Sequence, residues 1–181
     1  MEGCETLTPS RADHTQWLRL AIVLAGLVLL IAYSAPALIS QDPLWFVNRF
    51  DRRPVQIIIH GQNGQRVELW PGHPDFDRLA EAVQACLSQG LRQPSGLSLS
   101  DASLSSTNTR SVTVEVVFLR PVRLHTWFAT EESTRMLFPI TDRHPELALV
   151  ILGQNDRYLS SPPVLHTVEP LREALRSLGY Y

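Results

Sequence analysis

The uncharged segment from Leu20 to Gln41 constrains this chain more than any other feature of its sequence. It is mostly aliphatic and contains no acidic or basic side chain. About 20 helical residues, rising 1.5 Å each, cross the ~30 Å hydrocarbon core of a bilayer. The pattern therefore predicts a transmembrane helix over residues 17–39, with a polar tail over 1–16 before it and a soluble domain over 54–181 after it.

A cleaved signal peptide is the alternative interpretation, because Ala35-Pro36-Ala37 has the small-residue spacing of a cleavage site. The tail, however, is long and carries acidic as well as basic residues. Aromatic residues also flank the segment, as they do at membrane interfaces; they are Trp17, Tyr33, Trp45 and Phe46. We favour a retained helix, which makes the lipid bilayer a partner of residues 17–39.

The numbers of arginines on the two sides of this helix are nearly equal, so charge alone does not set its orientation. Arg11 and Arg19 precede it, whereas Arg49, Arg52 and Arg53 follow it, all within reach of the positive-inside rule. A single helix after a short tail usually keeps its N-terminus inside, so we expect a single-pass membrane protein with an extracytoplasmic domain.

Composition excludes several functions. The net charge of −2 gives no reason to expect a nucleic-acid partner. All sixteen basic residues are arginine, so a Walker A loop, Schiff-base chemistry and a kinase-type ATP lysine are excluded. The two cysteines, Cys4 and Cys86, lie on opposite sides of the apolar segment and form no disulfide framework. Cys86 is predicted to be a core residue of a helix.

Residues 40–53 are predicted to form an amphipathic juxtamembrane helix that starts at Asp42-Pro43. Its apolar positions would be Leu44, Trp45, Val47 and Phe50. Such a helix would lie at the level of the lipid headgroups or bind a partner, and the sequence leaves both open.

Two strands, Val55–His60 and Arg66–Trp70, surround Gly61-Gln62-Asn63-Gly64. A three-residue loop with Gly64 in the left-handed conformation places one set of apolar residues on a single face. That set is Val55, Ile57, Ile59, Val67 and Leu69. We expect this longer loop because a two-residue Asn-Gly turn would mix the faces.

Two helices are predicted in the domain. The first follows His73-Pro74, with Asp75 as its N-cap, and ends before Gly90. The second starts near Thr167 and buries a stripe of apolar residues at helical spacing, namely Val168, Leu171, Leu175 and Leu178.

Further strands lie between these helices. Alternation from Val112 to Phe118 predicts a half-buried strand, which either bends at Pro121 or folds into a hairpin there. Another strand is expected near 135–140, and the apolar run Leu147–Leu152 is predicted to be a central strand. Residues 92–110 read as a long loop, with a loose edge strand near 97–100.

The fold class is therefore α+β: one N-terminal transmembrane helix, then an antiparallel sheet of about five to seven strands with two helices on one side, in the order ββα-βββ(β)-(β)α. Over residues 54–181 this order resembles longin- and profilin-like domains and PAS-like sensor domains. The resemblance is in element order alone, so it transfers neither function nor residues.

The domain contains an internal similarity at an offset of 92 residues. Ile59-His-Gly-Gln-Asn63 aligns with Ile151-Leu-Gly-Gln-Asn155, and identities recur at Pro71/Pro163, Leu79/Leu171, Glu81/Glu173 and Ala82/Ala174. Residues 55–87 and 147–178 are thus either two related ββα units or two similar hairpins shaped by the same turn chemistry.

No catalytic, cofactor or metal site is predicted with a recognisable motif. The weak candidates are His73 with Asp75 and His144 with Glu146, because a histidine beside a carboxylate can bind a metal or transfer protons. The alternative is structural, since x-Pro-acid also starts helices and turns. Arg120, Arg123 and His125 with Trp127 suggest an anion-binding strip on a strand, or a solvated face.

Three functions remain open. The first is a non-enzymatic binding or scaffolding domain, tethered outside a bacterial-type membrane and contacting a membrane or envelope protein. The second is a membrane-tethered hydrolase or metal-dependent enzyme that uses histidines and carboxylates. The third is a ligand-sensing domain, which requires a substantial apolar pocket.

Overall fold

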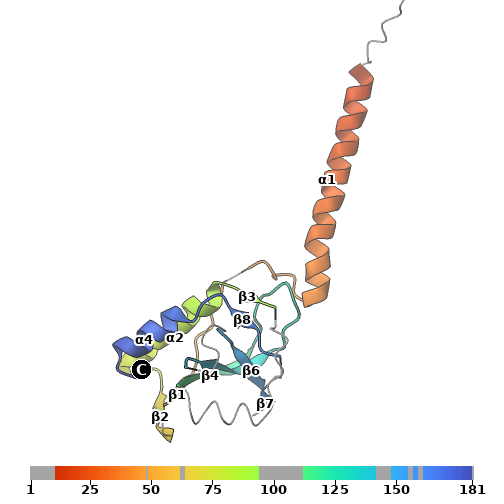
Figure 1. Ribbon diagram of the computed structural model, residues 1–181. Coiled ribbons are helices and arrows are strands. Elements are labelled where there is room, and N and C mark those ends of the chain that lie inside the picture. The colour runs from red at the N-terminus through yellow and green to blue at the C-terminus, as the bar shows by residue number, and fades with distance from the viewer. Residues whose placement is uncertain are drawn as a thin grey trace, which may run out of the picture.

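A computed structural model describes residues 11–47, 49–61, 64–93, 112–141, 148–154, 157–158 and 161–180. Helix α1 (Arg11–Ser40) projects from the rest of the molecule (Figure 1). Its stretch Thr15–Ser40 is long and apolar enough to cross a membrane, and none of its most apolar window is buried in the molecule. A signal sequence near an N-terminus has the same properties. Because the helix begins at Arg11, the last part of the predicted polar tail is helical.

The chain after α1 forms turns, so the prediction of an amphipathic helix within 40–53 is wrong. Gln41 adopts a left-handed conformation (φ 53°), and the Asp42 N–H donates to the Ala37 carbonyl at 3.2 Å, which closes the helix end and reverses the chain. Asp42 accepts the Leu44 N–H at 2.8 Å, as a cap would. The chain then packs back against the helix instead of starting a new one, and the Tyr33 hydroxyl donates to the Pro43 carbonyl at 3.1 Å.

The domain is built on a six-stranded antiparallel sheet in the order β2-β1-β4-β5-β6-β7. The strands are β1 (Gln56–His60), β2 (Arg66–Leu69), β4 (Thr113–Val122), β5 (Ser133–Pro139), β6 (Ile151–Gln154) and β7 (Arg157–Tyr158). Together with two domain helices this confirms the predicted α+β class, with its antiparallel sheet. The first hairpin has the predicted register, with Ile59 opposite Val67, and Gly64 has a φ of 77°.

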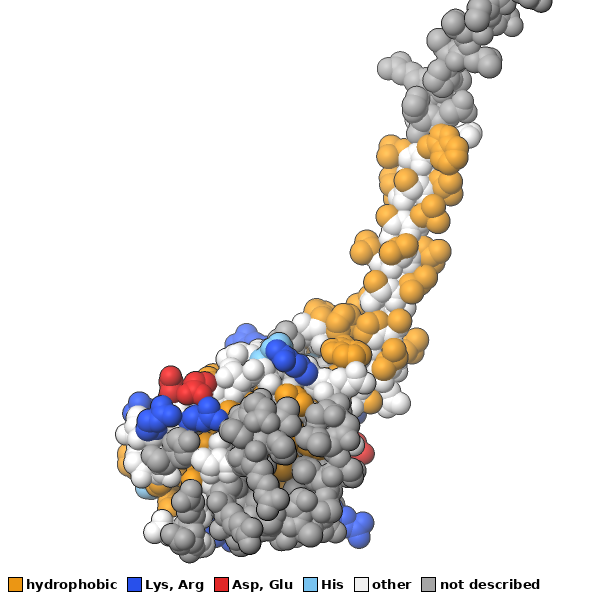
Figure 2. Space-filling view, viewed as in Figure 1, with side chains coloured by type: hydrophobic (Ala, Val, Ile, Leu, Met, Phe, Trp, Pro, Cys, Tyr) orange, Lys and Arg blue, Asp and Glu red, His pale blue; other side chains and the backbone are white. Residues whose placement is uncertain are grey.

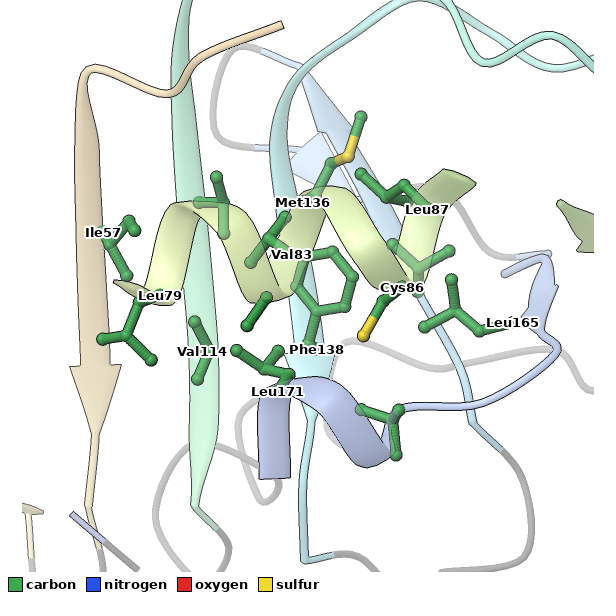
Figure 3. Packing of buried hydrophobic residues seen from close by; sticks show 14 of the residues in the cluster. Ile57, Leu79, Val83, Cys86, Leu87, Val114, Met136, Phe138, Leu165 and Leu171 are labelled. Atoms are coloured by element: carbon green, nitrogen blue, oxygen red, sulfur yellow. The ribbon is translucent and has the colours of Figure 1, made fainter. Parts of the chain in front are cut away.

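One row of buried side chains crosses five strands of the sheet on the face that carries the helices. The register aligns Leu69 and Ile57 with Val116, Met136 and Leu152, and none of the five is more than 2% exposed. Helices α2 (Pro74–Ser88) and α4 (Glu169–Ser177) cover this row (Figure 3). At ~1.5–3 kcal/mol for each large apolar side chain removed from water, this interface is the main source of stability in the domain.

The ends of α2 and α4 follow local sequence chemistry, with one correction. The N-cap of α2 is His73, not the predicted Asp75, because the His73 Nδ1 accepts the Asp75 N–H at 3.2 Å. Gly90 has the predicted left-handed conformation beyond the helix end (φ 84°). In front of α4, the Thr167 hydroxyl accepts the Glu169 N–H at 3.1 Å, and Pro170 lies in the first turn, where no intrahelical donor is needed.

The run Leu147–Leu152 is not a central strand, which corrects the prediction. The strand begins only at Ile151, and β6 lies one strand from the edge of the sheet. Before it, Leu149 pairs with Val164 of a second, two-stranded sheet, formed by β3 (Leu91–Arg92) and β8 (Val164–Leu165). The described part of the run, residues 148–152, is therefore apolar because it passes through the core between two sheets.

The strand that starts at Thr113 continues through Pro121, so no hairpin forms there, but it ends at Val122 and is shorter than the alternation predicts. Its pairing with β5 shifts between Val117 and Val122. The predicted loose edge strand near 97–100 lies outside the described residues.

The two ββα segments occupy comparable places. Their hairpins form opposite edges of the sheet, and α2 packs beside α4 (Figure 1). Aligned helix positions are buried alike, as in Leu79 and Leu171, both 0% exposed. The aligned strand residues differ, because Ile59 faces the helices whereas Ile151 packs with Leu137 on the other face. A common origin of the two segments stays a prediction.

We expect Leu171→Ala to lower the free energy of unfolding by about 2–5 kcal/mol, because it leaves a cavity between α4 and the sheet. Denaturant unfolding of the full chain in detergent micelles, followed by tryptophan fluorescence, measures this change. Glu173→Ala on the exposed side of the same helix is the control, with an expected change within about 0.5 kcal/mol. Equal effects of the two substitutions would contradict the packing of α4.

Candidate functional site

The predicted pair His73 and Asp75 lies at the start of α2, where both side chains make contacts that stabilise the fold. The His73 ring caps α2, and its Nδ1 lies 3.9 Å from the Asp75 carboxylate. That carboxylate accepts the Tyr180 hydroxyl at 2.8 Å, which ties the end of the chain to the start of α2. The other predicted pair, His144 with Glu146, lies outside the described residues. Among the residues described, no three metal-ligating side chains lie close enough to hold an ion.

The sheet face opposite the helices contains a buried polar network centred on Glu115, which sequence reasoning missed. His60 Nε2 donates to one Glu115 oxygen at 3.1 Å. Arg135 Nη1 and the Tyr158 hydroxyl donate to the other oxygen, at 2.9 and 3.2 Å. The four residues come from β1, β4, β5 and β7, so the network joins four of the six strands.

Electrostatics keeps this carboxylate ionised. The hydrogen bond from His60, reinforced by the charge of Arg135, lowers the pKa of Glu115 in spite of its burial. Burial and the neighbouring Glu115 charge raise the pKa of Tyr158 to about 12, so its hydroxyl remains a donor. A carboxylate that accepts three hydrogen bonds is a weak base, which suits it to joining strands and not to proton transfer.

Gly153 makes the approach of Tyr158 possible. It lies opposite Tyr158 in the β6–β7 pair, and a Cβ atom at this glycine would lie 2.8 Å from the tyrosine ring. The conformation of Gly153 is ordinary, so the glycine is needed here for space and not for a positive φ. The aromatic ring therefore lies across the strand, with its hydroxyl directed at Glu115.

The junction between α1 and the domain is held by a second set of polar contacts. His125 Nδ1 donates to Asp42 at 2.6 Å, and the Asp42 side chain is only 6% exposed. Arg123 Nη1 donates to the Gln41 carbonyl at 3.0 Å, which stabilises the left-handed residue at the helix end. The end of α1 is thus bonded directly to the loop after β4.

A cavity of about 460 Å³ lies beside this junction, and we call it the junction pocket. It is lined by residues from four segments: Trp45, Phe46, Gln89, Gly90, Leu91, Arg92, Gln93, His125, Thr126, Trp127 and His166. Histidine and arginine side chains gather next to apolar ones where α1 meets the domain (Figure 2). The volume is within the range of small-molecule sites.

Three of the residues predicted to form an anion-binding strip lie near the junction pocket. They do not form the face of a strand, as the prediction had it. The strand ends at Val122, so Arg123, His125 and Trp127 lie in the following loop. Arg123 and His125 bind the chain after α1, whereas Trp127 lines the pocket. Arg120 is exposed on β4 and is not among the lining residues described.

Cys86 is confirmed as a core residue. It is 0% exposed between α2 and the sheet, and burial raises the pKa of its thiol to about 11. At neutral pH the thiol is protonated and shielded, so it is unsuited to nucleophilic chemistry.

Comparison with known proteins gives no match: no protein-family model, no curated protein and no solved structure is significantly similar to this chain.

We expect Glu115→Gln to lower the free energy of unfolding at neutral pH by about 1–3 kcal/mol, because three donors lose an ionised acceptor. The pKa of Glu115 is lower in the folded chain than its ordinary value of 4.5. Its contribution is therefore complete above pH 4.5 and is lost as the pH falls through the lowered pKa.

Denaturant unfolding of both proteins between pH 7 and pH 3 measures this difference. The variant should lose less stability on acidification than the parent chain. Glu81→Gln, on the exposed face of α2, is the control and should leave the acid profile unchanged. Identical acid profiles for Glu115→Gln and the parent would contradict the role assigned to Glu115.

Proposed function

We propose that this chain is a single-pass membrane protein whose α+β domain is a non-enzymatic binding module, outside the cytoplasm and held close to the bilayer. The observation that carries the proposal is the contact of Asp42 with His125 next to a long, exposed apolar helix. A retained span followed by a flexible linker would leave the domain free to diffuse around it. Here the helix end is bonded to the domain, so the span and the domain surface keep a fixed relation.

The partner surface that we propose lies on the face of the sheet that the helices leave uncovered. Leu69 and Phe118 are core residues, and the residues that follow them, Trp70 and Leu119, are 52% and 80% exposed. Because side chains alternate along strands, both lie on the face opposite the helices. Only β1 separates β2 from β4, and the register offsets the two positions by two residues, which places them about 12 Å apart. A membrane or envelope protein is the partner we expect there.

The structure supports the two alternative functions, an enzyme and a ligand-sensing domain, to different degrees. An enzyme based on histidines and carboxylates has no support from His73 and Asp75, which cap α2 and bind Tyr180. Ligand sensing is the second candidate, because the junction pocket supplies a cavity of suitable size. It is compatible with the first proposal, since one domain can bind a small group at the pocket and a protein at its sheet.

Topology can be measured with two reporters fused after Tyr181, one active only outside the cytoplasm and one only inside it. We expect activity of the outer reporter alone. The mass of the purified membrane-bound chain should also include residues 1–37, which cleavage after Ala37 would remove. An active inner reporter with a silent, well-expressed outer one would contradict the proposed orientation, and a truncated mass would contradict retention.

Partner binding can be measured with a photo-crosslinking amino acid placed at Trp70 or Leu119 in the full chain in intact membranes. We expect both positions to yield an adduct with the same protein. The control is Glu81 on the exposed side of α2, which should yield no such adduct. Adducts that are equally abundant from all three positions, or absent from all three, would contradict this surface.

A further inference from the structure

We propose that the junction pocket binds the phosphate-bearing headgroup of an anionic phospholipid from the same bilayer that α1 spans. This inference rests on the proposed function, because it requires α1 to be a retained span. The pocket lies just past Ser40, where α1 ends, and its first lining residues are Trp45 and Phe46. A helix that crosses the hydrocarbon core from residue 17 to residue 39 places these residues at the level of the headgroups.

The polar lining of the pocket is rich in donors. Arg92 Nη2 lies 3.2 Å from His166 Nδ1, and a guanidinium group can only donate. Nδ1 of His166 is therefore the acceptor, and the proton of the neutral ring is on Nε2, which is a second donor. Both side chains are exposed at the pocket, so a ligand can reach them.

The Asp42 carboxylate beside the pocket is already hydrogen-bonded. None of the described lining residues is acidic, and the nearby Asp42 carboxylate is buried against His125 and the Leu44 N–H. An anion entering the pocket thus meets a guanidinium group and imidazole rings without a free carboxylate to repel it. Arginine is well suited to this role, because its planar fork matches two phosphate oxygens.

The indole of Trp45 supplies a further donor. Its Nε1 is buried and has no hydrogen-bond partner in the described part of the chain. Turning this ring toward an acceptor in the pocket therefore breaks no hydrogen bond. The aromatic walls, Phe46 and Trp127, are about half exposed and can contact the glycerol and upper acyl carbons of the lipid. A phospholipid with an anionic phosphate and an apolar acyl region therefore fits both the polar and the aromatic parts of the lining.

Lipid binding is measured by adding phosphatidylglycerol to the delipidated full chain in detergent and counting bound lipids by native mass spectrometry. We expect one tightly retained phosphatidylglycerol per chain. Arg92→Gln should weaken its binding by about 10-fold or more, because a charge-assisted hydrogen bond is lost. Trp45→Phe, which keeps an aromatic ring but removes the N–H, should weaken it a few-fold. Arg52→Gln removes the same charge outside the pocket and should change the affinity less than 2-fold.

Two further arms identify the source of the phosphate. In the first, phosphatidylcholine replaces phosphatidylglycerol. Its choline ammonium is repelled by the guanidinium of Arg92, so we expect weaker binding, which Arg92→Gln lowers by a smaller factor than it lowers the binding of phosphatidylglycerol. In the second, inorganic phosphate and glycerol 3-phosphate compete with the lipid. Failure to compete at millimolar concentration assigns the pocket to the lipid, whereas competition that Arg92→Gln abolishes assigns it to a soluble phosphate ester.

The lipid assignment is overturned if phosphatidylglycerol binds no more tightly than phosphatidylcholine, or if a soluble ester displaces it by a competition that Arg92→Gln abolishes. It is also overturned if Arg92→Gln and Arg52→Gln have equal effects. If the chain stays in the membrane after alkaline extraction but retains no lipid, lipid binding at the pocket is refuted and the tethered module is not. A chain released by alkaline extraction refutes the tethered module, and the soluble-ester arm then still tests the pocket.

Discussion

The apolar surface of α1 is unfavourable in water, and the organisation of the chain depends on which apolar environment covers it. Its aliphatic side chains are exposed along the helix, and none of its most apolar window is buried against the described part of the domain. Each Leu, Ile or Val that enters an apolar environment gains ~1.5–3 kcal/mol. Summed over the helix, this gain far exceeds the stability of a typical domain. A bilayer satisfies the requirement without any further contact from the protein, which is why the helix can be uniformly apolar.

The junction connects this apolar helix to the domain. A left-handed glutamine costs ~1–2 kcal/mol relative to ordinary helical geometry. The structure offsets that cost with hydrogen bonds from Arg123 to Gln41 and from His125 to Asp42. Glycine would remove the strain, but it would lose more conformational entropy on folding than glutamine does. The result is a firm connection that holds a donor-rich cavity against the end of α1.

The two faces of the sheet are stabilised by different forces. Toward the helices, rows of aliphatic side chains pack together and exclude water. On the other face, Leu137 and Ile151 form a small apolar cluster beside the ionised Glu115. A buried carboxylate is tolerated there because each of its oxygens receives a hydrogen bond from a neighbouring strand. Removing one partner would leave charge without compensation, so the network favours one register of the four strands over the alternatives.

The sequence by itself determined the elements whose causes are local. The uncharged run predicts α1, alternation predicts the first hairpin with its three-residue loop, and helical spacing predicts α2 and α4. It also predicts that Cys86 is buried, because that residue belongs to the apolar stripe of α2. Each of these follows from periodicity or turn chemistry within about twenty residues.

Only the tertiary structure decided what depends on distant residues. Glu115 looks like an ordinary outward residue of a strand until His60, Arg135 and Tyr158 are brought to it from three other strands. The segment after Asp42 has the pattern of a helix, yet it forms turns because contacts 83 residues away in the chain hold it. The junction pocket has no motif either, since its lining comes from four separate segments. Local patterns cannot encode these sites, because the free energy that forms them comes from chain segments that only folding brings together.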